Sequence, residues 1–417
     1  MELAELTTIP TTENQLPEGW MNFRLGVVCK IKKGVQFNKI ELSDAGVFPC
    51  INGGIEPSGY SDLWNTHENT ITISEGGNSC GYVNFIKTKF WSGGHCYTLL
   101  DLKENLDKKF LYQVLKGRQN LIMDLRVGSG LPNIQQKAIK EFEIPLPQSL
   151  IEQRQIAAIL TKIDEAIAQT VALIAKYNRL KTGLMQDLLS RGIDEQGCIR
   201  SEATHAFKDS PLGRIPVEWE CVTIGDIADL KSGGTPSRQN SSFWGGLIPW
   251  VKTGEVNYNT IYSTEELITE KGLKFSSATL FPTNTILMAL YGQGKTRGRV
   301  ALLGTEAATN QACLGFLNLR RVTTNFLYIS LTFEYDKLRD LSNDGAQKNL
   351  SADLLRKYLL KIPSDLAEQK KMDKMFEKVG ISILEQKLHL QKLKLLKSGL
   401  MQDLLSGRVR VKQTAEK

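Results

Sequence analysis

The chain has 417 residues, of which 41% are hydrophobic and 23% are charged, and its formal net charge is +7. This composition is typical of a water-soluble globular protein with room for two to four domains. No stretch approaches the ~18 uninterrupted apolar residues of a membrane helix, and the N-terminal segment lacks the basic and apolar regions of a signal peptide, so we expect a cytoplasmic protein. The modest positive charge permits a polyanionic partner without proving one.

The sequence is a tandem repeat. The segment LKTGLMQDLLS at 180–190 returns as LKSGLMQDLLS at 396–406, with a single difference. The same offset of 216 relates Pro147 to Pro363 and Glu152-Gln153 to Glu368-Gln369, whereas an offset of 199 relates Pro17 and Trp20 to Pro216 and Trp219. The chain is therefore predicted to hold two copies of one unit, a domain followed by a helix, with extra residues inside the second copy.

Each copy opens with a region rich in Gly, Asn, Thr and aromatic residues. Short apolar runs bounded by turn residues predict strands at 69–74 and 97–102 in the first copy, and at 285–290 and 313–319 in the second. We expect an α+β fold class with two tandem globular domains of mixed α/β structure, each followed by a long helix. The predicted boundaries are an N-terminal segment 1–16, a domain 17–148, a helix 149–192, a linker 193–215, a domain 216–364, a helix 365–407 and a tail 408–417.

Apolar residues alternate three and four apart in both predicted helices, which is the pattern of a coiled-coil seam. One seam position is polar in both copies, as Thr170 and Gln386. We predict that the two helices pair as an antiparallel coiled coil; the alternative is that each helix lies back on its own domain. The seam residues are Ile156, Leu160, Ile163, Ile167, Ile174 and Tyr177, then Met372, Phe376, Val379, Ile383, Leu390 and Leu393.

Two pairs of glycines stand in or just after the predicted helices. Gly183 and Gly399 lie in the helix interiors, which indicates either a close helix approach or a tolerated glycine. Both helices are expected to continue through the leucines of the repeated block, where the steps change and the seam drifts locally; these are Leu180, Leu184 and Leu188, then Leu396, Leu400 and Leu404. Gly192 and Gly407 are placed to end the helices.

We find no convincing catalytic constellation in the sequence. The seven cysteines form no C-x-x-C pair, which predicts reduced thiols, and the four histidines lack metal-ligand spacing. Residues 291–299 contain the Gly-Lys-Thr that ends a P-loop motif, but Ala289 stands where that motif requires glycine. A turn whose basic side chains face a phosphate backbone is therefore the better interpretation. Both halves are predicted to be binding modules, with no metal and no cofactor of their own.

Several segments of the chain are specific to one protein family. They are SGGTPSRQNSSFWGGLIPWVKTGEV at 232–256, ATNQ at 308–311, Asn349-Leu350, the LKxGLMQDLL blocks, LPNI at 131–134 and IEQ at 151–153. With these segments the chain resembles the specificity (S) subunit of Type I restriction-modification systems, the HsdS family. The first copy is the more divergent one, since its segment 33–36 departs from the family's glycine-threonine-proline pattern and leaves its target sequence open.

The resemblance implies a DNA sequence-specificity subunit that is not itself an enzyme. Each domain would be a target-recognition domain for one half of an asymmetric bipartite site in double-stranded DNA. The helices would set the spacer between the half-sites and dock modification (methyltransferase) subunits, expected to be two. Those subunits would carry S-adenosylmethionine, and a restriction/translocase subunit would join the assembly.

Physical chemistry indicates which side chains could contact DNA. Arg and Lys distinguish guanine, and Asn and Gln distinguish adenine, in the major groove, while Lys, Arg and hydroxyl groups meet phosphates. The candidates in the first domain are Lys32, Lys33, Gln36, Asn38, Lys39, Asn52, Asn78 and Lys87. The candidates in the second domain are Lys231, Ser232, Thr235, Ser237, Arg238, Gln239, Asn240, Lys252, Gln293, Lys295, Arg297, Arg299, Gln347, Lys348 and Asn349.

Two other functions stay open at this point. A coiled-coil adaptor that binds proteins alone would show no DNA retention at low salt. A nuclease or methyltransferase in its own right would act as the purified chain without a partner.

Overall fold

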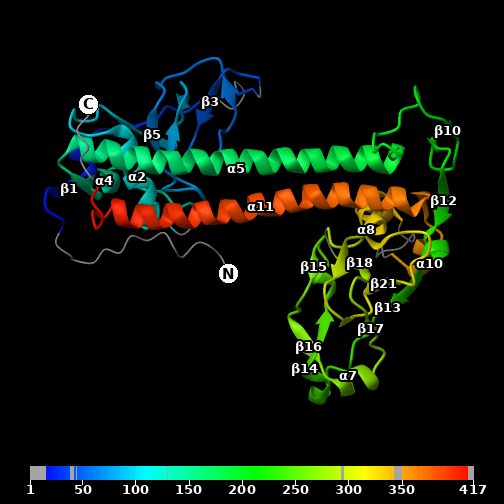
Figure 1. Ribbon diagram of the computed structural model, residues 1–417. Helices are drawn as coiled ribbons and strands as arrows, with labels where there is room; N and C mark the ends of the chain where they lie inside the picture. The colour runs from blue at the N-terminus through cyan, green and yellow to red at the C-terminus, as the bar shows by residue number, and fades with distance from the viewer. Residues whose placement is uncertain are drawn as a thin grey trace. The chain divides into compact units, whose positions relative to one another are not determined.

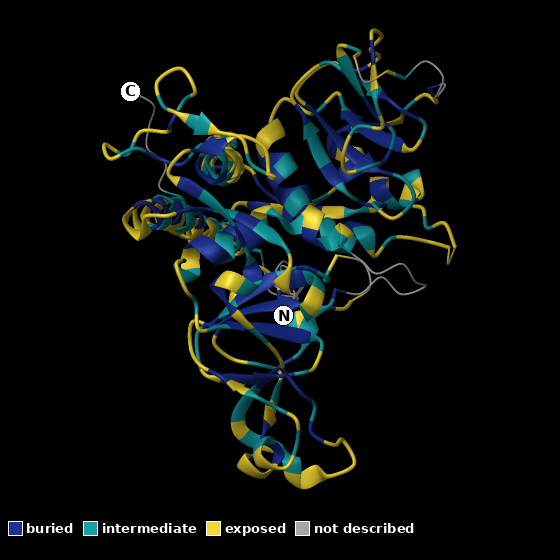
Figure 2. Cartoon of the chain, turned by 90° about the vertical axis from the view of Figure 1, so that its right-hand side faces the viewer, coloured by how far each residue is buried: buried dark blue, intermediate teal, exposed yellow. Residues whose placement is uncertain are grey.

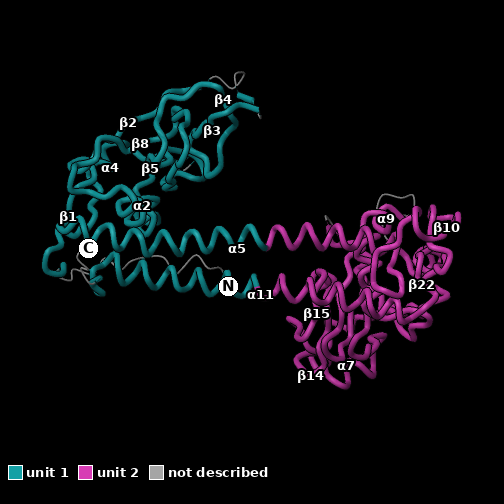
Figure 3. The backbone as a smooth tube through the Cα atoms, turned by 45° about the horizontal axis from the view of Figure 1, so that its top comes forward, with its two compact units in different colours: residues 1–173, 386–417 teal, residues 174–385 magenta. Residues whose placement is uncertain are grey.

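The structure is a computed structural model that describes residues 16–37, 42–43, 45–128, 130–292, 295–341 and 350–411. It divides into two compact units, one of residues 1–173 and 386–417 and one of residues 174–385 (Figure 3). Each unit holds one globular domain, the beginning of one long helix and the end of the other. The units are thus not contiguous in sequence, because both helices run from one into the other.

The domain of the first unit is a mixed α/β structure (Figure 1). Its four-stranded antiparallel sheet has the order β2-β8-β5-β6, a smaller sheet has the order β4-β3-β7, and β1 pairs with β9. The helices α2 and α4 lie toward the long helices, whereas β3 and β4 lie toward the far end of the domain. The elements are β1 (Trp20–Arg24), α1 (Leu25–Val28), β2 (Lys30–Lys33), β3 (Phe48–Ile51), β4 (Tyr60–Ser61), β5 (Thr70–Ser74), β6 (Val83–Ile86), β7 (Trp91–Ser92), β8 (Cys96–Leu100), α2 (Lys108–Gly117), α3 (Gln119–Met123), α4 (Gln136–Glu141) and β9 (Glu143–Pro147).

The second unit repeats this plan with larger sheets, of order β13-β21-β18-β19-β15 and β16-β14-β20-β17. Its β14, β16 and α7 lie toward the end of the domain away from the long helices. The elements are β10 (Phe207–Lys208), β11 (Ile215–Pro216), β12 (Trp219–Thr223), α6 (Ile224–Ile227), β13 (Asp229–Ser232), η3 (Ser241–Phe243), β14 (Trp244–Val251), η4 (Thr253–Glu255), β15 (Thr260–Ile261), β16 (Glu266–Ile268), α7 (Glu270–Lys274), β17 (Leu280–Phe281), β18 (Ile286–Ala289), β19 (Val300–Leu303), β20 (Ala307–Thr309), β21 (Cys313–Leu317), α8 (Thr324–Phe333), α9 (Tyr335–Asp340), α10 (Ala352–Arg356) and β22 (Leu359–Pro363).

The predicted strands at 69–74, 97–102, 285–290 and 313–319 are confirmed as β5, β8, β18 and β21. Their side chains are almost entirely buried, as expected of central strands covered on both faces. Figure 2 shows the buried residues concentrated along such strands, while the loops at the domain ends are largely exposed.

The strand that opens each domain pairs with the strand that closes it, and the register repeats. Trp20 lies opposite Pro147 in the β1–β9 pair, and Trp219 lies opposite Pro363 in the β12–β22 pair. The partners that were related by offsets of 199 and 216 in the sequence are therefore equivalent in three dimensions. The additional residues of the second copy lie between these two strands.

A buried glutamine at the start of each long helix makes the same hydrogen bonds in both units. Gln153 Nε2 donates to Pro147 O at 2.9 Å, and its Oε1 accepts from the Asp107 backbone N at 2.8 Å. Gln369 makes the equivalent bonds to Pro363 O and from Thr323 N, both at 2.9 Å. Since Asp107 and Thr323 are the N-caps of α2 and α8, each glutamine ties a domain helix to the long helix.

The long helices are α5 (Leu150–Arg191, 42 residues) and α11 (Leu366–Leu404, 39 residues). In each unit the start of one helix, the end of the other and the domain share a single apolar core. Each long helix therefore packs on its own domain at its start, and the end of the other helix joins the same core. The helix residues in these cores are Ile156, Leu160, Met401, Leu404 and Leu405 in the first unit, and Leu188, Leu189, Met372 and Phe376 in the second.

The glycines inside the helices do not mark a close helix approach. A Cβ built on Gly183 or on Gly399 would meet no atom within 4 Å, so these positions are tolerated glycines. Leu180 and Leu396 are 53% and 51% exposed, in the part of the helices where the seam was expected to drift, whereas Leu188 and Leu404 further along are buried in the two cores. Gly192 and Gly407, in contrast, have φ of +62° and +70°, which is the left-handed conformation expected just after a helix.

All seven cysteines lie within the described ranges as free thiols, in agreement with the prediction. Burial raises the pKa of Cys29, Cys96 and Cys313 to about 12. Cys198, in the linker, is the exposed one. Within the described ranges, no helix combines the length and the low polarity that a membrane span requires.

Candidate nucleic-acid interface

The loop 233–240 of the second domain follows β13 and is held closely by its neighbours. A Cβ on Gly233 would lie 2.0 Å from Thr309 Oγ1, which explains why glycine is needed there. The indole of Trp250 donates to the Gly234 carbonyl at 3.0 Å, and the indole of Trp244 donates to the Ser237 carbonyl at 3.1 Å. This loop carries five of the fifteen predicted residues of the second domain, and these contacts hold it in place.

Arg238 is the central side chain of this loop. Its guanidinium lies 3.7 Å from the ring centroid of Trp244 and 5.1 Å from that of Trp250, and its Nη2 donates to Glu266 Oε2 at 2.6 Å. The hydrogen bond from Arg238 lowers the pKa of the Glu266 carboxyl. Because the Arg238 guanidinium stacks on Trp244 of β14 and binds Glu266 of β16, it holds the loop against these two strands.

Other predicted residues of this loop also have partners in the protein. Thr235 Oγ1 donates to Gln311 Oε1 at 2.5 Å, and the Asn240 side chain accepts from Ser242 N at 3.1 Å, where it caps η3. Lys252 Nζ pairs with Glu265 and lies 3.9 Å from Glu266. The structure therefore brings Arg238 and Lys252 together around the same acidic side chain.

The predicted turn is present at residues 295–298. It lies outside the loop 233–240 and packs on α9. Arg297 Nη2 donates to the Arg339 carbonyl at 3.1 Å, and Arg299 Nη1 donates to Asn257 Oδ1 at 2.7 Å. Lys295 is exposed, and its carbonyl accepts from the Tyr335 hydroxyl at 2.6 Å. The ammonium group of Lys295 is thus the most accessible charge of the three.

Glu75 organises the equivalent region of the first domain. Its Oε1 accepts from Lys33 Nζ at 2.6 Å and from the Tyr97 hydroxyl at 2.9 Å, and its Oε2 lies 3.4 Å from His95 Nδ1. Burial raises the pKa of the Glu75 carboxyl, but the hydrogen bonds from Lys33 and Tyr97 outweigh it, so the net pKa is lowered. The carboxylate neutralises Lys33, which the sequence had suggested as a DNA contact.

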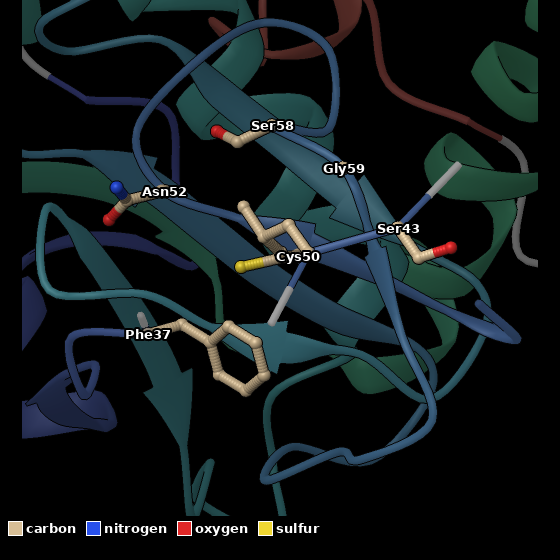
Figure 4. Close-up of a pocket in the computed structure, with 7 residues that line it drawn as sticks. Phe37, Ser43, Cys50, Asn52, Ser58 and Gly59 are labelled. Carbon is tan, nitrogen blue, oxygen red and sulfur yellow. The ribbon is translucent and has the colours of Figure 1, made fainter. Parts of the chain in front are cut away.

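A pocket of about 370 Å³ opens beside β3 in the same domain (Figure 4). Phe37, Cys50 and Asn52 are among its lining residues, and the Asn52 Oδ1 accepts from His95 N at 3.2 Å. Burial raises the pKa of the Cys50 thiol, so the sulfur is not an activated nucleophile. Gln36, next to Phe37, donates from Nε2 to the Phe37 carbonyl at 3.2 Å.

The predicted residues therefore fall into three groups. Those with side-chain or ring partners are described above. Asn38, Lys39, Gln293, Gln347, Lys348 and Asn349 lie outside the described residues. The remaining ones are exposed and have no side-chain partner within the described part of the chain, and they are Lys32, Asn78, Lys87, Lys231, Ser232, Ser237, Gln239 and Lys295.

Sequence reasoning missed the residues that hold this surface in place. Glu266 and Glu75 lie 28 and 42 positions away from the cations that they neutralise. No local spacing links such pairs, because they meet only after the sheets have formed. Trp244 and Trp250 stand in the segment that carried the resemblance, but nothing in that segment indicates that Arg238 stacks on them.

Comparison with known proteins gives a consistent result. A family model for the Type I restriction modification DNA specificity domain matches residues 17–176 and 216–394. The MjaVIII specificity subunit of Methanocaldococcus jannaschii is 26% identical over 419 residues, which are 95% of each chain. A protein of Mycoplasma genitalium named as a type I specificity subunit is 33% identical over 51% of this chain and 53% of its own length.

A crystal structure of the Type I restriction-modification S subunit from M. genitalium aligns with a TM-score of 0.67 at 23% identity, covering 98% of this chain and all of that one. At this identity the likeness concerns the fold. The two matched segments of the family model are the two repeats defined by the strand pairs and the buried glutamines. The chain therefore belongs to the family of Type I restriction-modification DNA specificity proteins and carries two copies of the family's domain.

Proposed function

We propose that this chain is the DNA sequence-specificity subunit of a Type I restriction-modification complex in the cytoplasm, and that it has no catalytic activity itself. Each domain recognises one half of a bipartite site in double-stranded DNA. The proposal rests on a contrast within each domain. Beside the long helices the two domains are alike, since Gln153 and Gln369 make matching hydrogen bonds. In the loops they differ, since the loop around Arg238 has no counterpart at 33–36.

The exposed cations that have no acidic partner among the described residues are the best candidates for phosphate contacts. A lysine that is already paired with a carboxylate gains little from a phosphate, because the phosphate must displace the carboxylate. We therefore assign phosphate contact to Lys32, Lys87, Lys231 and Lys295, and base recognition to the exposed amides Asn78 and Gln239. Arg238 acts as support for the loop.

We further propose that α5 and α11 form an antiparallel coiled coil that sets the spacer. Within the first unit, Lys397 of α11 pairs with Asp164 of α5 at 2.5 Å, a contact that supports this arrangement. A helix of 42 residues is ~63 Å long at ~1.5 Å per residue. Inserting four residues into both helices, after Leu173 and after Lys387, adds ~6 Å and about one helical turn. The methylated motif should then keep its two halves and gain about one or two base pairs between them.

The helices also offer two matching faces for partners. Leu180 and Gly183 on α5 are exposed and identical to Leu396 and Gly399 on α11, although the surrounding domains differ. Exposed apolar residues carry no core packing, so packing does not explain why the two copies match. We propose that each face docks one modification subunit, giving two per chain, with S-adenosylmethionine bound to those subunits and a restriction subunit joining them.

Exchange of residues 216–364 for the domain of another family member tests the main proposal. The chimera is expressed with its modification subunit in a cell without other methylation, and the methylome is sequenced. One half of the motif should change and the other should stay. A change in both halves contradicts independent recognition, and absence of any bipartite motif with the natural chain favours the protein-binding adaptor.

A further inference from the structure

A buried carboxylate joins the second domain to the linker and to the start of α11. Glu368, in the first turn of α11, is 8% exposed and forms two hydrogen bonds with Arg200, from Nη1 at 2.6 Å and from Nη2 at 3.0 Å. It also accepts from the Ile193 backbone N at 3.0 Å and from the Trp219 indole at 3.2 Å. Arg200 lies in the linker that follows α5, so the linker is tied to both the domain and the start of the next helix.

The first unit contains an equivalent arrangement, built from the C-terminal tail. Glu152, in the first turn of α5, is 1% exposed, and Arg410 donates to its two oxygens at 2.7 and 2.8 Å. The third nitrogen, Arg410 Nη1, donates to the Glu18 carbonyl at 2.8 Å, just before β1. The tail therefore clamps the two places where the chain enters and leaves the first domain.

The glycine after each long helix permits this clamp. A Cβ on Gly192 would lie 2.2 Å from Glu368 Oε1, and a Cβ on Gly407 would lie 2.8 Å from Pro17 and 3.0 Å from the Trp20 ring. Both glycines have positive φ, so a side chain would be strained as well as crowded. In both places a glycine with positive φ stands between the end of one helix and the arginine that reaches the glutamate at the start of the other.

We propose that these two arginines are positioning residues, and that Arg410 holds the first domain in the orientation in which it recognises its half-site while Arg200 does so for the second domain. The inference rests on the proposed function, because it assumes one half-site per domain. Apolar cores also join each domain to the helix ends, so loss of a clamp loosens the domain without detaching it. A loosened domain penalises a wrong base pair less, because its contacts can shift.

The two clamps are not equally strong. The Arg200 side chain is 8% exposed, whereas that of Arg410 is 43% exposed. The Trp219 indole donates to Glu368, but the buried Trp20 indole N–H has no partner within the described residues. The clamp of the tail is therefore the easier one to open, and it is the one to test first.

The test uses the full chain assembled with its modification subunits, after methylome sequencing has given the site. Methylation rates are compared on three DNA duplexes: the cognate site, a site with one mismatch in the first half, and a site with one mismatch in the second half. Arg410→Ala should lower the discrimination ratio for the first half about tenfold, the effect of one base-pair contact, and leave the ratio for the second half unchanged. Arg410→Lys should restore part of the loss.

Arg408→Ala is the matched control, because it removes the same charge from the same tail. Arg408 pairs with the exposed Asp403 at 3.1 Å and does not touch Glu152. Its discrimination should equal that of the natural chain. Glu152→Gln, which keeps hydrogen-bonding atoms at the clamp, serves if Arg410→Ala does not fold, and it should act on the first half alone.

The outcomes separate the two proposals. Equal loss for both halves, or no change in either ratio, overturns the positioning role. A natural assembly that shows no bipartite motif overturns the proposed function itself. Arg200→Ala supplies the mirror experiment, in which the second half should lose discrimination.

Discussion

Replacing Gly183 and Gly399 with alanine should have opposite effects on stability and on partner binding. Both glycines lie inside long helices, and a Cβ at either would meet no atom of this chain within 4 Å. Glycine is ~1 kcal/mol less favourable than alanine in a helix interior. Each substitution should therefore raise the free energy of unfolding of the isolated chain by up to ~1 kcal/mol.

The same methyl group projects into the face that we assign to a modification subunit. Where a partner approaches a glycine closely, added volume in the packed interface costs ~1–3 kcal/mol. The affinity for the modification subunit should then fall by about tenfold or more. Urea unfolding of the chain alone and calorimetric titration with the modification subunit measure the two effects.

Gly380→Ala provides the control for this pair of measurements. Gly380 lies in α11 and is equally open, but position 164 of the other copy is aspartate, so it belongs to no repeated face. It should give a similar gain in stability and no change in binding. A loss of stability at 183 or 399 would refute the exposed placement, and undiminished binding would refute the docking face.

Three further predictions concern charged residues. Lys295→Ala should lower the slope of log K against log salt for DNA binding by ~0.9, the loss of one phosphate contact, and an unchanged slope would place the turn away from DNA. Arg200→Ala should cost ~3–5 kcal/mol of unfolding free energy, because Glu368 stays buried without its charge partner, whereas the exposed pair of Arg408 should contribute at most ~1 kcal/mol; urea unfolding of both variants compares them. The pKa of Glu75 is lowered in the folded protein, so its contribution to stability is present above the unfolded value of about 4.3 and is lost as the pH falls through the folded value. Unfolding curves of Glu75→Gln and the natural chain should therefore differ at pH 7 and converge once the pH has fallen below the folded-state pKa.

The repeat explains how much of this structure the sequence could predict. Matching residues such as Trp20 and Trp219 located the start of each domain, and apolar periodicity located α5 and α11 to within a residue or two at their starts. Both signals are local or are carried by identity between copies. Leu180 is half exposed because the steps of the apolar pattern change there and the seam drifts, and a helix that continues need not keep one face buried.

The interface was harder to predict because charge in a sequence does not show which partner neutralises it. Lys33 and Arg238 are candidates for DNA contact in the sequence, and the structure adds that Glu75 and Glu266 pair with them. Lys231 looks the same in the sequence and has no such partner within the described residues. These pairings depend on strand order, which the spacing of residues along the chain does not encode.

The distribution of the thiols gives this chain a built-in site for a reporter group. Thiol reagents attack the thiolate, and a thiol whose pKa is about 12 supplies almost none at neutral pH. Cys29, Cys96 and Cys313 are in that state, while Cys198 is exposed and lies two positions before Arg200. A fluorophore or spin label attached to the natural sequence should therefore go mainly to Cys198, where its mobility would report directly on whether the linker is held against Glu368.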